Sequence, residues 1–208
     1  MNTEERTKTA EKKPVSRRKK ILLAAIAVIA AASAAELFRS NYCIETEKFV
    51  FRSESVPEGF DGAKIVQLSD YHNHGGGYDD RLIEKIKEQE PDYIFITGDI
   101  ADALRTDIDK ANVFLEKVSK ITDCYLVWGN HDYNITDAQR EKMAECCTEN
   151  GITVLENEYT VVERDGDKML LVGTVAELTA ALFRLCLRII RMKKCLRSGF
   201  IIILRIFM

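Results

Sequence analysis

The sequence predicts an α/β fold in which helices cover a largely parallel sheet, preceded by one apolar helix near the N-terminus. Short apolar runs typical of buried strands alternate with amphipathic helical segments over the middle of the chain, and this repetition is typical of parallel sheets. Three of the apolar runs end in loops rich in Asp, Asn, His and Gly. Because ligands bind beyond the carboxyl ends of strands in such sheets, we expect the functional site there.

Length and composition are those of one globular domain with distinct terminal segments. The chain has 208 residues, 30% of them charged, and a formal net charge of −3, so it is long enough for a sizeable core. The lack of a global basic excess argues against nucleic acid as a specific partner. The six cysteines include no Cys-x-x-Cys pair, which favours small buried thiols over a disulfide framework or a zinc site.

The N-terminal segment predicts a membrane anchor. Residues 1–20 form a basic tail that ends in Arg17-Arg18-Lys19-Lys20, and residues 21–38 are apolar and rich in alanine. As a helix, residues 21–38 would reach roughly 27 Å, close to a hydrocarbon core of about 30 Å. Because basic flanks stay in the cytoplasm, the first interpretation is a single-pass signal anchor in the cell membrane with the rest of the chain outside.

Three other interpretations of the apolar segment remain open. Ala32-Ser33-Ala34 fits the small-residue pattern of signal cleavage, which would give a secreted protein. Ser16-Arg17-Arg18 resembles the start of a twin-arginine export signal, although the following Lys19-Lys20 fits that signal poorly. A buried core helix is the third interpretation, and the basic flank argues against it.

The remaining chain divides into a linker with an edge strand over 39–62, a domain over 63–174 and a tail over 175–208. Residues 47–53 have the composition of a strand. Further strands are predicted at 63–68, 93–97, 125–128, 152–155, 159–163 and 168–172. Helices are predicted to start at Asp79-Asp80, at the capping residue Asp107 and at Asp137. Asp165-Gly166-Asp167 predicts a hairpin turn.

Three polar motifs follow the first three strands of the domain. They are Asp70-Tyr71-His72, Gly98-Asp99-Ile100-Ala101-Asp102 and Gly129-Asn130-His131-Asp132. Carboxylate, imidazole and amide oxygen are donors that hard or borderline divalent metals favour. Their convergence at neighbouring strand ends predicts a site for two metal ions.

These motifs resemble those of the calcineurin-like metallophosphoesterase family, in particular its small bacterial membrane-anchored members. The family carries D-x-H, G-D-x-x-D and G-N-H-[DE] in this order, and the likeness extends from about Lys64 to Val172. The resemblance implies a layered β-sandwich flanked by helices. It also implies hydrolysis of phosphomonoesters or phosphodiesters by two divalent ions (Mn, Fe, Zn or Mg) and a bridging hydroxide.

The resemblance also implies roles for individual residues. The implied metal ligands are Asp70, His72, Asp99 and Asn130. Asp70 and His72 would bind the first ion, Asp99 would bridge both ions, and Asn130 would bind the second. His131 would stand beside the phosphate as proton donor or charge stabiliser, and Asp102 would orient the site.

The motif series then stops. The family supplies further histidines after the third motif, whereas the histidines of this chain are His72, His74 and His131. We therefore expect 63–174 to be the N-terminal part of such a domain, with impaired activity because the distal ligands are absent. The alternative is a non-enzymatic, membrane-tethered remnant. A phosphoester substrate and the membrane are the expected partners.

The tail over 175–208 is basic and apolar, with Glu177 as its one acid. The abrupt change of composition suggests a frame-shifted or truncated end. The alternative is an amphipathic basic helix on an anionic membrane, since Arg184, Arg188, Arg191 and Lys194 recur at helical spacing.

Several polar or aromatic residues near the motifs have ordinary structural interpretations. We expect His74 to be a surface residue, Trp128 to lie in the core, and Asp132 and Tyr133 to serve in a turn and in packing. Asp102 could equally start a helix.

Overall fold

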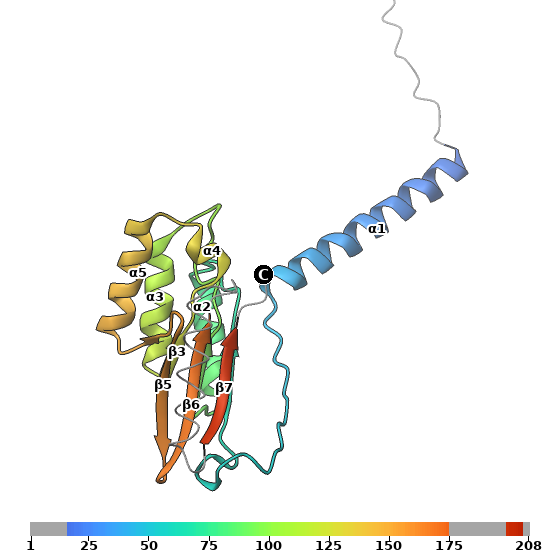
Figure 1. Ribbon diagram of the computed structural model, residues 1–208. Coiled ribbons are helices and arrows are strands. Elements are labelled where there is room, and N and C mark those ends of the chain that lie inside the picture. Colours follow the sequence, from blue (N-terminus) through green and yellow to red (C-terminus); the bar gives the residue numbers. More distant parts are fainter. Residues whose placement is uncertain (1–15, 175–198, 206–208) are drawn as a thin grey trace, which may run out of the picture. The chain divides into compact units, whose positions relative to one another are not determined.

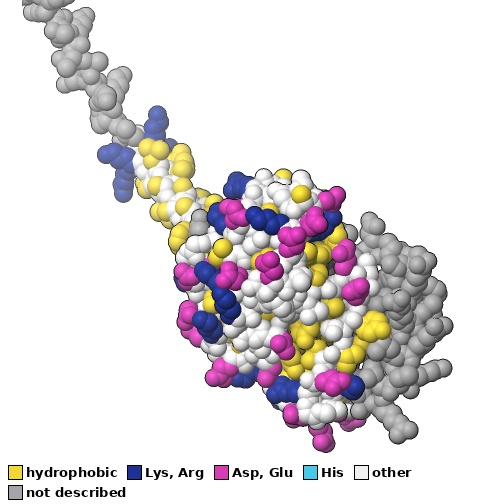
Figure 2. Space-filling model, turned by 90° about the vertical axis from the view of Figure 1, so that its left-hand side faces the viewer, with side chains coloured by type: hydrophobic (Ala, Val, Ile, Leu, Met, Phe, Trp, Pro, Cys, Tyr) yellow, Lys and Arg dark blue, Asp and Glu magenta, His cyan; other side chains and the backbone are white. Residues whose placement is uncertain are grey.

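The computed structural model describes residues 16–174 and 199–205. The chain divides into two units, and the boundary along the sequence lies between Glu47 and Lys48. The first unit contains α1 (Arg17–Tyr42), whose start is capped by the Ser16 side chain. Its stretch Arg17–Arg39 is long and apolar enough to cross a membrane, and its apolar side chains are exposed. Basic side chains gather at the beginning of this helix (Figure 2). The helix is longer at both ends than the predicted 21–38.

The second unit is built on two sheets (Figure 1). The first has four parallel strands in the order β1-β2-β3-β4: β1 (Ile65–Leu68), β2 (Tyr93–Ile96), β3 (Asp123–Leu126) and β4 (Thr153–Val154). The second has β5 (Glu158–Arg164) antiparallel to β6 (Asp167–Thr174), and β7 (Gly199–Arg205) parallel to β6. Because β1, β2 and β3 are neighbours in register, their carboxyl ends lie side by side.

Helices cover one face of the parallel sheet. They are α2 (Gly77–Lys87), α3 (Ile108–Ser119) and α5 (Asp137–Glu149). Ile94, Ile96 and Leu126 lie in one buried cluster with Phe114 and Leu115 of α3, and all five are fully buried. This cluster is the larger part of the core.

The opposite face of the parallel sheet packs against the second sheet. Phe95 and Val127, which alternate with the helix-facing residues, lie in a second buried cluster with Val162, Met169 and Leu171. Side chains of a strand point alternately to its two faces, so a strand covered on both faces is apolar throughout, as the Tyr-Ile-Phe-Ile of β2 is. The order helices, parallel sheet, second sheet confirms the predicted layered α/β fold.

Local sequence signals explain several element boundaries. The Asp107 side chain accepts the N–H of Lys110 and caps α3, as predicted. Thr136 and Gln139 form a capping box at the start of α5. The predicted hairpin joins β5 to β6, with φ of 52° at Asp165 and 86° at Gly166, the left-handed pair that a type I′ turn requires.

The structure corrects the sequence prediction in the linker. Residues 47–53 form no strand, and Phe49 and Phe51 are 86% and 71% exposed. Composition favours a strand, but a strand also needs a neighbour for its backbone groups, and no strand in the described part of the chain pairs with this segment. Helix α2 begins at Gly77, ahead of the predicted Asp79-Asp80.

The tail is described over 199–205, where β7 extends the second sheet. The basic positions Arg184, Arg188, Arg191 and Lys194, on which the amphipathic-helix interpretation rests, lie outside the described residues. On the face shown in Figure 2, acidic and basic side chains are interspersed over the second unit, as is usual for a solvated surface.

The close approach of the two sheets depends on Gly173 of β6. A Cβ atom at this position would overlap with Leu155 and lie 2.7 Å from Val127 Cγ1. We expect Gly173→Ala to lower the free energy of unfolding by about 1–3 kcal/mol through overpacking. Urea unfolding followed by the fluorescence of Trp128, the one tryptophan of the chain, measures this.

Gly77→Ala is the matched control, because a Cβ there meets nothing within 4 Å. This helical substitution should leave stability unchanged or raise it by up to about 1 kcal/mol. Equal stability of the two variants would contradict the packing argument.

Candidate metal centre

The three polar motifs lie on adjacent loops at the carboxyl ends of β1, β2 and β3. Backbone hydrogen bonds join the first loop to the second: the N–H of Asp70 donates to the carbonyl of Gly98 at 3.2 Å, and that of His72 to the carbonyl of Asp99 at 3.0 Å. The Asn73 side chain adds to this pairing by accepting the N–H of Asp102 at 3.1 Å and donating to the carbonyl of Arg105 at 2.9 Å. The first two motifs therefore form one connected structure.

Backbone strain is concentrated in these loops. Asp70, His72, Asn73 and Asp99 all have positive φ, between 47° and 57°. Asp, Asn and His tolerate this left-handed region better than other side chains, yet such residues persist only where the surroundings hold them. Strain of this kind gathers at functional sites, which supports the predicted location of the site.

Asp99 connects the second motif to the third. It is 8% exposed, and its Oδ1 accepts the N–H of His131 at 2.8 Å. Gly129 faces it so closely that a Cβ there would overlap with Asp99 Oδ1. The glycine of the third motif is thus required by the position of the Asp99 carboxylate.

Asp132 is the residue whose role sequence reasoning understated. Its carboxylate is fully buried and accepts the N–H groups of Asp99, Ala101 and Gly129, each at 2.8 Å. Burial raises the pKa of Asp132, and the backbone N–H groups of Ala101, Gly129 and Ile100 oppose that shift. The predicted turn position is wrong, because Asp132 lies in the short helix α4 (Asn130–Tyr133), and its carboxylate fixes the second loop against the third. No pattern in the sequence signals the distant donors.

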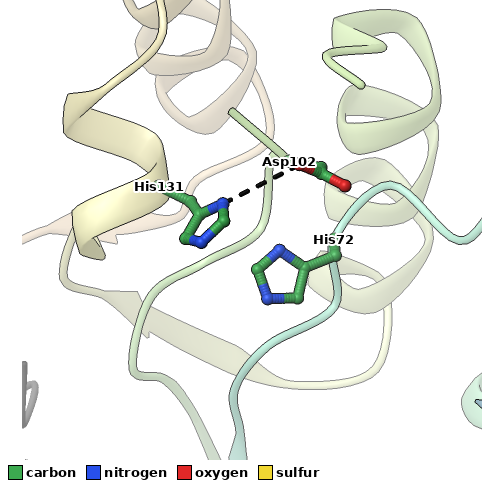
Figure 3. Close-up of side chains that lie close together, drawn as sticks. All are labelled: His72, Asp102 and His131. Atoms are coloured by element: carbon green, nitrogen blue, oxygen red, sulfur yellow. Dashed lines mark ion pairs between the residues drawn. The ribbon is translucent and has the colours of Figure 1, made fainter. Parts of the chain in front are cut away.

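Two groups of side chains bring potential metal ligands together. In the first, ligand atoms of Asp70, His72 and Asp99 lie within 4.8 Å of one another; in the second, those of His72, Asp102 and His131 do. His72 belongs to both, and its ring lies 4.6 Å from that of His131, centroid to centroid (Figure 3). The Nδ1 atom of His72 is buried without a hydrogen-bond partner among the described residues. A buried ring nitrogen without a partner is suited to bind a metal cation or to accept a hydrogen bond from a ligand.

His131 and Asp102 lie side by side (Figure 3). His131 Nδ1 accepts the N–H of Ala103 at 3.2 Å and lies 3.8 Å from Asp102 Oδ1. Because Nδ1 accepts this hydrogen bond, the neutral imidazole carries its own proton on Nε2. Asp102 in turn accepts the N–H groups of Leu104 and Arg105, and its pKa is lowered, first by the bond from Leu104. Asp102 lies within the loop between β2 and α3 and does not start a helix.

The remaining predicted residues lie nearby. Asn130 is the first residue of the short helix α4 (Asn130–Tyr133) and is half-buried, directly before His131. His74 is exposed and stacks on Tyr78, with ring centroids 4.1 Å apart, in agreement with the predicted surface position. Trp128 lies in the core, as predicted.

The buried carboxylate of Asp132 yields a stability prediction. Asp132→Asn leaves one acceptor oxygen for three backbone donors, so we expect a loss of roughly 2–4 kcal/mol in the free energy of unfolding. Trp128 fluorescence in urea, without added metal, measures it. Asp137→Asn, at an exposed carboxylate, is the control, and a loss no larger than that of the control would contradict the assigned role.

Comparison with known proteins gives the family. The family model described as calcineurin-like phosphoesterase matches residues 63–173, more than half of the chain. The uncharacterized metallophosphoesterase YkuE of Bacillus subtilis (strain 168) is 35% identical over 134 residues, which are 62% of this chain and 46% of that protein. A transmembrane protein with metallophosphoesterase domain from Danio rerio is 31% identical over 137 residues, covering 63% of this chain and 31% of that protein.

Solved structures show weaker similarity. A protein of Thermus thermophilus aligns with a TM-score of 0.46 and 12% identity over 68% of this chain and 67% of that chain. The phosphopantetheinyl hydrolase of Mycobacterium tuberculosis aligns with a TM-score of 0.41 and 21% identity over 53% of this chain and 41% of that chain. The chain spans less than half the length of the curated relatives it matches. On the match over 63–173, the chain belongs to the calcineurin-like phosphoesterase family of hydrolases, as its three motifs predict.

Proposed function

We propose that this chain is a metal-dependent phosphoesterase whose first ion binds between Asp70, His72 and Asp99. The observation that carries the proposal is that ligand atoms of these three residues lie within 4.8 Å of one another. Two oxygen donors and one imidazole suit manganese, iron, magnesium or zinc. Asp99, with Asn130 from the next loop, is the proposed site of a second ion.

Divalent ions bound here would supply a nucleophile at neutral pH, by lowering the pKa of a water molecule, and would offset charge on the phosphoryl oxygens. The protein contributes the positions of the groups around them. Asn130 offers a neutral oxygen, which limits the negative charge facing an anionic substrate. His131, with Nδ1 occupied by the Ala103 N–H, has Nε2–H free to donate to a phosphoryl or leaving-group oxygen. The Ala103 N–H orients this ring, and Asp102 acts through the loop, since its carboxylate accepts the N–H groups of Leu104 and Arg105.

The ligand count of this chain makes the two proposed ions unequal. His72 serves the first ion, His131 faces the substrate, and His74 is an exposed residue stacked on Tyr78. Among the residues that the structure describes, Asp99 and Asn130 are the ligands proposed for the second ion. We expect weak binding of that ion and low turnover. The alternative function is a membrane-tethered, non-enzymatic protein that holds one ion weakly or none.

Metal content and turnover test the proposal. After dialysis with Mn²⁺, the purified chain should retain close to one ion, and its turnover of p-nitrophenyl phosphate should be low. Asp99→Asn removes the proposed shared ligand, so its affinity for Mn²⁺ should fall at least about 10-fold. Elemental analysis and electron paramagnetic resonance of free Mn²⁺ measure these quantities.

Asp109→Asn is the matched control, because Asp109 is exposed and pairs with Lys142 at 2.7 Å. It should bind Mn²⁺ as the unchanged chain does. Metal retained equally by Asp99→Asn and Asp109→Asn would refute the site, and absence of retained metal in the unchanged chain would favour the non-enzymatic alternative. Robust turnover would refute the expected impairment.

We further propose that α1 anchors the chain in the membrane with the second unit outside the cytoplasm. The helix has the necessary length and composition, and Arg17, Arg18, Lys19 and Lys20 form its basic first turn, which the positive-inside rule assigns to the cytoplasm. The proposed order along the chain is a basic tail over 1–20, an anchor over 21–38, a linker over 39–62 and the hydrolase segment over 63–174.

Protease treatment of intact spheroplasts tests the orientation. The second unit should be digested from outside, while cells without protease should yield the uncleaved chain by mass spectrometry. Protection of the second unit until the membrane is lysed would contradict the orientation. A product that begins near residue 35 would establish signal cleavage instead.

A further inference from the structure

One buried carboxylate behind the candidate metal centre has no part in the proposed chemistry. Asp79, in the first turn of α2, is 1% exposed. Its Oδ1 accepts the hydroxyl of Tyr71 at 2.6 Å, and its Oδ2 lies 4.0 Å from Lys117 Nζ of α3. A buried carboxylate is stable only where hydrogen bonds or opposite charges compensate for the loss of water. Tyr71 and Lys117 supply these contacts, but they do not by themselves give Asp79 a function.

Tyr71 is held on three sides. Its hydroxyl donates to Asp79 and accepts the N–H of Gly75 at 2.9 Å. Its ring stacks on Phe114 of α3, with centroids 4.0 Å apart and an angle of 12°. These contacts fix both the hydroxyl and the ring of Tyr71.

The position of Tyr71 in the chain gives these contacts their consequence. It stands between Asp70 and His72, whose φ angles are 57° and 49°. Residues in this left-handed backbone conformation are strained, and they keep it only where surrounding contacts hold the loop in place. The Tyr71 side chain ties this loop to α2 and α3, in addition to the backbone hydrogen bonds that join the loop to the second motif.

We propose that the hydrogen bond between Tyr71 and Asp79 positions Asp70 and His72 for metal binding, which makes Tyr71 and Asp79 positioning residues of the metal centre. This inference rests on the proposed function, since it concerns the first of the two proposed ions. Groups that orient metal ligands without touching the ion commonly change metal affinity 10- to 100-fold when removed.

Three substitutions separate the hydrogen bond from the ring and from the charge. Tyr71→Phe keeps the ring on Phe114 and removes the hydroxyl. Asp79→Leu removes the acceptor, whereas Asp79→Asn keeps an acceptor oxygen and removes the charge. We expect Mn²⁺ affinity to fall about 10- to 100-fold in Tyr71→Phe and Asp79→Leu, and to stay within about threefold of the unchanged chain in Asp79→Asn.

The measurement is titration of the full chain in detergent with Mn²⁺, with the free ion followed by electron paramagnetic resonance. The double variant Tyr71→Phe/Asp79→Leu should bind no more weakly than either single variant, because both remove the same bond. Tyr133→Phe is the matched control: it removes a hydroxyl that donates to Glu156 at 2.8 Å, beside the same centre, and should leave affinity unchanged.

Each outcome decides for or against the inference. Affinity in Tyr71→Phe equal to that in Tyr133→Phe overturns it, as does Asp79→Asn binding as weakly as Asp79→Leu. Should Asp79→Leu fail to fold, as judged by Trp128 fluorescence, the pair Tyr71→Phe and Tyr133→Phe decides alone. Loss of affinity in Asp99→Asn but not in Tyr71→Phe refutes the positioning role and leaves the proposed function standing, whereas no loss in either refutes the metal site itself.

Discussion

The candidate centre depends on one buried carboxylate that touches no substrate. Asp132 gathers the N–H groups of Asp99, Ala101 and Gly129, so the loops after β2 and β3 have a single common acceptor. A carboxylate with three backbone donors is among the stronger arrangements of hydrogen bonds in proteins. Because Asp99 in turn accepts the His131 N–H, the position of the proposed shared metal ligand follows from the position of Asp132.

The parallel sheet explains why the sequence was so informative about this centre. Apolar runs at β2 and β3 and the three polar motifs are local signals, and strand–helix repetition implies that their loops share one edge. The register of β1, β2 and β3 confirms this arrangement. Capping at Asp107 and the left-handed turn at Asp165-Gly166 were predictable for the same reason, since a cap and a tight turn are decided by residues within a few positions of each other.

What the sequence did not reveal are contacts between residues distant in the chain. In the sequence, Asp79 resembles the exposed acids that are common in the first turn of a helix. It is buried because α2 packs beside Tyr71. Likewise, nothing near Asp132 indicates that Asp99 and Ala101 will donate to it. The prediction of a strand over 47–53 was wrong for a related reason. A strand forms only when a second segment pairs with it, and local composition describes only one of the two segments.

These contacts also bear on how the centre would bind an ion. Backbone hydrogen bonds to the second motif hold the loop that carries Asp70 and His72. The Tyr71 side chain also holds this loop, through its contacts with Asp79 and Phe114. A site held by hydrogen bonds within the protein loses little conformational freedom when a cation binds. Affinity at such a site is then decided mainly by the number and charge of its ligands, and the two proposed ions differ in that number. We therefore expect the first of the two proposed ions to bind more tightly than the second.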